Sequence, residues 1–186
     1  MPVGNINTFD SLQSSHGISG TLHRANVVTG GDDFTYSINR TITTSWSFGT
    51  GAGAVNQVVE TIFTAVKNTT TTLDLSGVLT NRIGDLLSTF TKVKYFKVEY
   101  LTVAQDATNG TASTGDVTIQ PGATNPITTS PLGTAEAFVL KPGAKLIWED
   151  ALNGFTVTGG SADTFDFVHS DNVLNANLRL TIYGEK

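Results

Sequence analysis

The sequence predicts an all-β protein, an antiparallel, jelly-roll-like β-sandwich preceded by an extended N-terminal arm. Residues 174–183 alternate between apolar and polar side chains, a period of two that gives a strand one buried face and one solvent face. The 186-residue chain contains 30 threonines and 19 glycines, which suit strands and tight turns respectively. About eight or nine strand-like segments follow one another at short spacing without crossover helices, an order that favours antiparallel pairing.

The first 32 residues differ from the rest of the chain because their apolar residues follow no sustained period. We interpret residues 1–32 as an extended arm that ends in a turn cluster, and residues 33–186 as the sandwich domain. Large apolar side chains are costly to leave in water, so the arm should lie against the body or against a neighbouring subunit. The residues expected at that interface are Ile6, Phe9, Leu12, Ile18 and Leu22.

The first strand of the sandwich is expected at residues 34–48, where most apolar residues share one parity and threonines take the other. A glycine-rich break at residues 49–54 follows, and residues 58–66 predict a strand that is buried on both faces. Residues 69–75 predict a short, threonine-rich strand. Between residues 77 and 90 a weak helical spacing predicts at most one or two turns of helix.

The longest extended stretch, residues 92–103, carries apolar residues on both faces and should be a central strand. A turn-rich loop at residues 106–116 contains Asn109-Gly110, the strongest short hairpin signal. Shorter strands, separated by Pro-Gly-Ala and Gly-Gly turns, are expected at residues 117–120, 137–141, 145–149, 154–158 and 164–169.

Charge and composition argue against several classes of function. The formal net charge is −5, whereas nucleic-acid and anionic-membrane surfaces need clustered lysine and arginine. The one basic cluster, Lys92, Lys94 and Lys97, is interpreted as polar positions along a strand. The sequence has no cysteine and no apolar run of membrane-spanning length, and its first residues, without a basic or an apolar region, lead us to expect no secretory leader. We therefore expect assembly in a reducing cytosol, with no nucleic-acid and no membrane partner.

Gly49, Gly51 and Gly53 have the spacing of a phosphate-binding loop. A dinucleotide fingerprint, however, needs a strand, this glycine pattern and then a helix within a parallel sheet. The residues that follow these glycines are strand-like, so we expect a flexible loop between two strands instead.

No spacing of histidine, aspartate or glutamate predicts a reaction centre. The three histidines, His16, His23 and His169, form neither a His-x-His pair nor a metalloprotease helix motif. Nothing in the sequence pairs the candidate acid–base carboxylates across a cleft. These carboxylates are Glu60, Glu99, Glu136, Glu149 and Asp150. We therefore expect a non-enzymatic protein with no catalytic residues, no cofactor and no resident metal.

Two groups of aspartates are candidate calcium ligands, since hard cations take carboxylate and carbonyl oxygens. They are Asp32-Asp33 and the set Asp163, Asp166 and Asp171. Neither group has the Asp-x-Asp-x-Asp-Gly spacing of a calcium loop, so solvated turn carboxylates are the favoured interpretation.

Trp46, Trp148 and Phe155 leave one binding function open. Aromatic residues in strands are usually buried, but two or three coplanar rings on an open face would form a platform for carbohydrate. Solvent-exposed tryptophans would favour such a platform, and burial of both would count strongly against it.

Several short motifs follow one another in a characteristic order between residues 73 and 184. They are Leu-Asp-Leu-Ser-Gly at residues 73–77, Phe-Thr-Lys-Val-Lys at 90–94, Asn125-Pro126, Leu-Lys-Pro-Gly-Ala at 140–144, Gly-Phe-Thr-Val-Thr-Gly-Gly at 154–160 and Ile-Tyr-Gly at 182–184. Over about residues 55–184 this order resembles the small β-sandwich virion proteins of tailed bacteriophages. The resemblance implies a head decoration or cement subunit, or a tail or fibre component, and it carries no catalytic residues.

We therefore expect a structural virion protein, a capsid decoration or cement subunit that assembles in the host cytoplasm. It should form a homo-oligomer, a trimer or a dimer, and should bind the major capsid protein or other virion proteins through its arm and sandwich edges. The alternative is a carbohydrate- or receptor-binding sandwich of a phage tail or fibre. A third hypothesis, an unrecognised hydrolase, requires a carboxylate pair with abnormal titration.

Overall fold

The computed structural model describes residues 12–24, 34–80, 86–87, 89–102, 113–133 and 135–186. Within these residues every regular element is a β-strand, so the prediction of an all-β protein is confirmed. The chain divides into two compact units, Met1–Ser47 and Phe48–Lys186.

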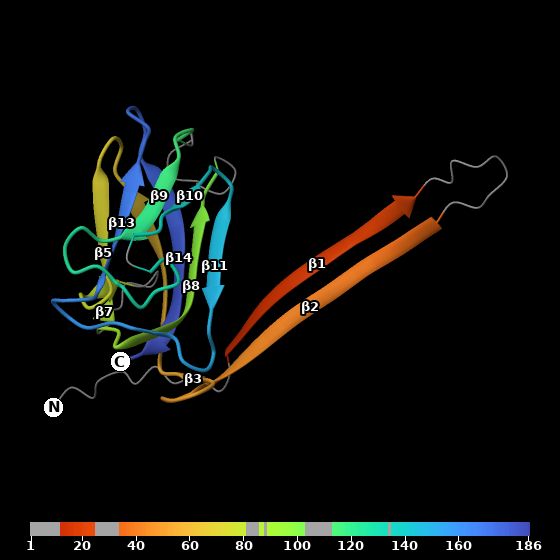
Figure 1. The fold of residues 1–186 in the computed structure, drawn as a ribbon, viewed down its shortest axis with the longest axis horizontal. Helices are drawn as coiled ribbons and strands as arrows, with labels where there is room; N and C mark the ends of the chain where they lie inside the picture. Colours follow the sequence, from red (N-terminus) through yellow and green to blue (C-terminus); the bar gives the residue numbers. More distant parts are fainter. Residues whose placement is uncertain (1–11, 25–33, 81–85, 88, 103–112, 134) are drawn as a thin grey trace. The chain divides into compact units, whose positions relative to one another are not determined.

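The first unit contains a long antiparallel β-hairpin (Figure 1). Its strands are β1 (Leu12–Arg24) and β2 (Phe34–Phe48), and they pair continuously from Leu12 opposite Trp46 to Arg24 opposite Phe34. The sequence predicted β2, but as the first strand of the sandwich, whereas β1 falls in the segment interpreted as an arm without a period. The expected boundary at residues 32 and 33 lies outside the described residues.

The second unit is a sandwich of two antiparallel sheets (Figure 1). One sheet has the strand order β10-β9-β13-β5. Its strands are β5 (Thr70–Asp74), β9 (Val117–Pro121), β10 (Phe138–Leu140) and β13 (Thr164–His169). The prediction of an antiparallel β-sandwich is thereby confirmed, while its jelly-roll-like character stays a prediction.

The second sheet has the order β11-β8-β14-β4, and a short strand β12 also pairs with β8. These strands are β4 (Gln57–Ala65), β8 (Lys92–Tyr100), β11 (Lys145–Glu149), β12 (Phe155–Thr156) and β14 (Ala176–Glu185). The strand predicted at residues 92–103, β8, is central as expected, because β14 pairs along one side of it and β11 and β12 along the other.

Three further short strands lie outside the two sandwich sheets. They are β3 (Ala54–Val55), β6 (Leu79–Thr80) and β7 (Leu86–Leu87). β3 is the third strand of the sheet with the order β1-β2-β3. The helical turn predicted between residues 77 and 90 is wrong for the described residues there, because β6 and β7 pair as a small antiparallel ladder. Apolar residues spaced like a helix face fit two short paired strands equally well.

Aromatic contacts join the two sheets across the core. Phe63 of β4 lies 4.8 Å from Phe167 of β13, and Phe96 of β8 lies 5.2 Å from Phe165, also of β13, between ring centroids. Phe155 completes the group at 6.0 Å from Phe165. Each buried aromatic ring contributes about 1.5–3 kcal/mol of transfer free energy, so this cluster holds the layers together.

The alternation that predicted the last strand is confirmed on its apolar side and only partly on its polar side. Leu178, Leu180 and Ile182 of β14 are fully buried in the core. Asn177 and Thr181 on the opposite face are also buried, at 8% exposure each. The reason is that β14 is an interior strand, so side chains of β4 and β8 flank its polar residues on both sides.

Candidate functional site

The register of the hairpin sorts its residues into two faces. Directly paired residues lie on the same face of a ribbon, and successive residues alternate between faces. One face carries the pairs Leu12–Trp46, Ser14–Thr44, His16–Ile42, Ile18–Arg40, Gly20–Ile38, Leu22–Tyr36 and Arg24–Phe34. The other carries Gln13–Ser45, Ser15–Thr43, Gly17–Thr41, Ser19–Asn39, Thr21–Ser37 and His23–Thr35. Every large apolar residue of these paired stretches therefore falls on one face, and the hairpin is amphipathic.

The described side chains of the polar face are exposed. Gln13, Ser15, Thr41, Thr43 and Ser45 all face solvent, and Gln13 Nε2 donates a hydrogen bond to Ser45 Oγ at 3.3 Å. Such a surface of hydroxyl and amide groups is stable in water and needs no cover.

Three of the five predicted interface residues lie in this hairpin. Leu12, Ile18 and Leu22 occupy positions on the apolar face, opposite Trp46, Arg40 and Tyr36 respectively. Ile6 and Phe9 lie outside the described residues. The prediction missed that this segment is itself a strand paired with β2, although Leu12, Ile18 and Leu22 share one parity, which was the signal available.

A second feature lies where the sandwich begins, at a β-bulge between β14 and β8. Tyr183 pairs with Tyr95, but Gly184 pairs with Val93, so Lys94 is the extra residue of the bulge. A bulge redirects the side chain of its extra residue. Gly184 permits the close approach, because a Cβ atom at this position would lie 2.1 Å from the backbone oxygen of Lys92.

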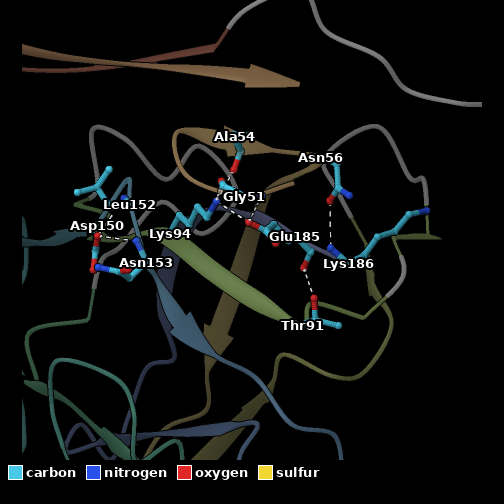
Figure 2. A network of polar contacts seen from close by, with 10 residues as sticks. All are labelled: Gly51, Ala54, Asn56, Thr91, Lys94, Asp150, Leu152, Asn153, Glu185 and Lys186. Atoms are coloured by element: carbon cyan, nitrogen blue, oxygen red, sulfur yellow. Dashed lines mark hydrogen bonds and ion pairs between the residues drawn. The ribbon is translucent and has the colours of Figure 1, made fainter. Parts of the chain in front are cut away.

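Lys94 is fully buried and makes three polar contacts (Figure 2). Its Nζ donates to the backbone oxygens of Ala54, at 2.7 Å, and of Gly51, and lies 2.5 Å from Glu185 Oε1. An ammonium group has three protons to donate, so all of them find acceptors here. Lys92, Lys94 and Lys97 all lie in β8, so their interpretation as positions along a strand is confirmed, but the bulge turns Lys94 inward and buries it.

Glu185 holds the same segment from the other side. Its Oε1 accepts a hydrogen bond from the Gly51 N–H at 3.0 Å, besides the contact with Lys94. Burial raises the pKa of Glu185, but the hydrogen bonds from Lys94 and Gly51 and the charge of Lys94 outweigh it, so the net pKa is lowered. The carboxylate is therefore ionised at neutral pH.

Backbone hydrogen bonds fix the rest of this glycine-rich segment. The N–H groups of Gly49 and Gly53 donate to the oxygens of Val55 (2.9 Å) and Ala151 (2.8 Å). Asn56 donates its N–H to Gly184 O at 3.0 Å and accepts the Lys186 N–H on Oδ1 at 3.0 Å. Since the amides of all three glycines are used internally, the segment offers no cradle of N–H groups for a phosphate.

A third group lies at the C-terminal end of β13, where a serine, a histidine and an aspartate come together. Ser113 Oγ lies 2.9 Å from His169 Nε2 and 2.7 Å from Asp171 Oδ2. Ser113 and His169 are both buried, at 2% exposure. Burial lowers the pKa of His169, an effect that the charge of Asp171 opposes, whereas hydrogen bonds from Ser113 and Val173 hold the pKa of Asp171 well below its usual range.

The order of contacts in this group is unlike a hydrolytic triad. A nucleophilic serine gives its proton to histidine, and the aspartate orients that histidine from its other side. Here Ser113 lies between the two partners and donates its proton to Asp171, so His169 acts on the serine as a donor. With the hydroxyl engaged and buried, the group serves to tie Ser113 to the turn after β13.

The aspartates weighed as calcium ligands fall into separate hydrogen-bond networks. Asp163 Oδ2 accepts from Ser76 Oγ at 2.8 Å, and Asp166 accepts from Thr72 Oγ1 at 2.7 Å and from the Ala123 N–H at 2.8 Å. Both carboxylates are buried, at 2% and 4% exposure. The interpretation as solvated turn carboxylates is therefore wrong for both, because neighbouring donors replace water.

Metal binding finds no further support within the part of the chain that the structure describes. No three histidine, aspartate or glutamate side chains gather there in a way that could hold an ion. Asp32 and Asp33 lie outside the described residues.

The three aromatic residues considered for a carbohydrate platform do not form one. Trp46 and Phe155 are each 1% exposed, and Trp148 is half-buried. The Trp148 ring lies 4.9 Å from that of Phe155 at an interplanar angle of 48°, so the two are not coplanar. These rings pack into the protein instead of forming an open row.

Comparison with other proteins adds no assignment to these features. Among the described residues there is no helix long and apolar enough to cross a membrane. No protein-family model, no curated protein and no solved structure matches this chain.

Proposed function

We propose that this protein is a non-enzymatic structural virion protein, a capsid decoration or cement subunit of the tailed-bacteriophage type. In this proposal it assembles in the host cytoplasm as a dimer or trimer and binds the major capsid protein or other virion proteins. The contacts are made by the N-terminal arm and by the sandwich edges. The single observation that carries the proposal is the amphipathic register of β1 and β2.

A long hairpin of this kind, paired with a third strand only at the short β3, needs a surface to rest on. Its 13 paired positions span about 40 Å at 3.3 Å per residue, and an isolated hairpin is at best marginally stable in water. Besides Trp46, seven positions of the apolar face carry large apolar residues. Their burial would contribute about 10–20 kcal/mol in gross terms. This is sufficient to offset an association cost of about 4–15 kcal/mol.

The sandwich offers a second contact at its edge. β10 is the outer strand in the order β10-β9-β13-β5, and Phe138 and Val139 in it are 37% and 51% exposed. An edge strand presents unpaired backbone groups beside its side chains, so apolar residues there favour pairing with another chain. This supports the part of the proposal that concerns sandwich edges.

The alternative, a carbohydrate- or receptor-binding module of a tail or fibre, has less support. It needs an open row of aromatic rings, whereas Trp46 and Phe155 are buried. Titration of the protein with glycans, followed by tryptophan fluorescence, tests this alternative directly.

The main experiment places one charge on either face of the hairpin in the full-length chain. Leu22→Asp introduces a carboxylate at the apolar face, and Thr21→Asp introduces the same group at the polar face one residue away. We expect Leu22→Asp to weaken self-association and co-sedimentation with capsids of the encoding virus at least tenfold, and Thr21→Asp to leave both unchanged. Circular dichroism checks that the sandwich remains folded in both variants.

Light scattering and capsid pelleting of the unaltered protein also test the proposal. A compact monomer that does not sediment with capsids would overturn the proposal. Equal effects of Leu22→Asp and Thr21→Asp would show that the hairpin faces are not distinguished by a partner.

A further inference from the structure

The segment of residues 49–56 has a special place in the chain. It follows β2 directly, so it is the part of the sandwich unit to which the hairpin is covalently attached. The segment is held by Lys94 from the bulge of β8 and by Glu185 from the end of β14 (Figure 2). These two residues come from adjacent strands of the second sheet.

We propose that Lys94 and Glu185 form a clamp that fixes the segment carrying the hairpin. In this conformational device the ion pair decides whether the turn at Gly51 is held against the sheet or moves freely, while the backbone hydrogen bonds of Gly49, Gly53 and Asn56 hold the rest of the segment. The clamp itself is argued from its geometry, and its importance for assembly rests on the proposed function of the hairpin.

The contacts centre on Gly51, which is held through both of its backbone polar groups. Its N–H donates to Glu185 Oε1 at 3.0 Å, and its oxygen accepts a hydrogen bond from Lys94 Nζ. Lys94 also reaches Ala54 O at 2.7 Å, so one ammonium group joins two points of the segment to the sheet.

The negative charge of Glu185 is what keeps Lys94 in place. A fully buried ammonium group without a counter-ion is strongly disfavoured, and carbonyl dipoles alone do not replace one. The carboxylate lies 2.5 Å from Lys94 Nζ and is the only anion that contacts it within the described residues. Neutralising Glu185 should therefore release the lysine and, with it, the turn at Gly51.

The segment has little intrinsic tendency to hold its shape alone. The φ angles of Gly49, Gly51 and Gly53 are 143°, 95° and 69°. Glycine adopts positive and negative φ angles with similar ease, so these values are not fixed by local conformational preference. A Cβ atom added at Gly51 or Gly53 would meet nothing within 4 Å, so side-chain packing does not restrain these residues. The restraint must come from the polar contacts.

Hydrogen exchange measured residue by residue tests the clamp in the full chain. In Glu185→Gln we expect the Gly51 amide to exchange at least tenfold faster than in the unaltered protein, while the Phe167 amide in the core strand β13 keeps its rate. The matched control is Glu99→Gln, the same change in β8, where Glu99 forms a half-exposed ion pair with Lys97 at 3.0 Å. That control should leave Gly51 unchanged.

Glu185→Gln leaves the buried charge of Lys94 without a counter-ion, which by itself destabilises the fold. A second variant therefore removes the lysine instead. Lys94→Met removes the buried charge while keeping a side chain of similar length. We expect this variant to fold, to show the same faster exchange at Gly51 and to be cleaved more readily by protease within residues 49–56.

Three results would overturn the clamp. They are an unchanged Gly51 rate in both variants, an equal acceleration in Glu99→Gln, and global unfolding of both variants, which would make the pair part of the fold as a whole. A protein that fails to self-associate would refute the proposed function but would leave the exchange result intact, so the two ideas fail separately.

Discussion

Replacing Gly184 by alanine should severely disturb the second sheet. An added Cβ atom would lie 2.1 Å from Lys92 O and 2.7 Å from Phe90 Cδ1. Non-bonded atoms need about 3.5 Å, so the strands must separate by roughly 1 Å or more. Neither neighbour can yield cheaply, because one is backbone and the other is the ring of a residue with 2% exposure.

The cost follows from what that separation breaks. On the side of β14 that faces β8, the Thr91 N–H donates to Glu185 O at 2.8 Å. Losing this hydrogen bond costs about 0.5–1.5 kcal/mol. Overpacking adds about 1–3 kcal/mol. We expect the free energy of unfolding to fall by about 3 kcal/mol, and Tm to fall by about 6–12 °C for a chain of this size.

The assay is thermal unfolding followed by circular dichroism, with Gly159→Ala as the matched control. The nearest atom to an added Cβ at Gly159 is Ser76 Cβ at 3.5 Å, an ordinary contact, so this control should stay within about 0.5 kcal/mol of the unaltered protein. If Gly184→Ala melts within about 2 °C of the unaltered protein, the close approach at the bulge is wrong.

Two further predictions concern the core and the buried histidine. Phe167→Ala removes a fully buried ring and should cost about 3–5 kcal/mol in urea unfolding. Val173→Ala, at a residue with 66% exposure, should cost less than about 0.5 kcal/mol, and similar losses would refute the assigned core. Burial lowers the pKa of His169 in the folded protein, so the unfolded chain takes up a proton at a higher pH than the folded chain does. The free energy of unfolding is therefore at its full value above about pH 6.5 and declines as the pH falls below it. Urea midpoints at several pH values should show this decline, and His169→Gln should lack it; an equal decline in that variant would contradict the assignment.

Local patterns were enough to predict most of the sandwich. β14 was predicted because Leu178, Leu180 and Ile182 alternate with polar residues, and β8 because apolar residues occupy both of its faces. Both signals depend only on neighbouring residues and on the period of a strand.

The hairpin and the clamp depend on pairings that a single strand does not reveal. β1 contains Gly17 and Gly20 and only three large apolar residues, so its period becomes visible only beside β2. Lys94 looks like its neighbours Lys92 and Lys97 in the sequence. It becomes different only because a register shift against β14 turns it inward, and register belongs to the tertiary structure.

The placement of β14 between β4 and β8 also has a consequence for folding kinetics. β4 pairs with β14 alone, joining residue 57 to residue 184 and residue 65 to residue 176, so this ladder closes a very long loop. Forming contacts between residues so distant in sequence costs loop-closure entropy, and this cost must be met before the contacts stabilise the folded state. Folding is therefore slow, on a time scale of about milliseconds to seconds. Until β14 has paired, β4 and β8 each have an unpaired edge. Expression at low temperature, which slows aggregation of such intermediates, should therefore increase the yield of folded protein.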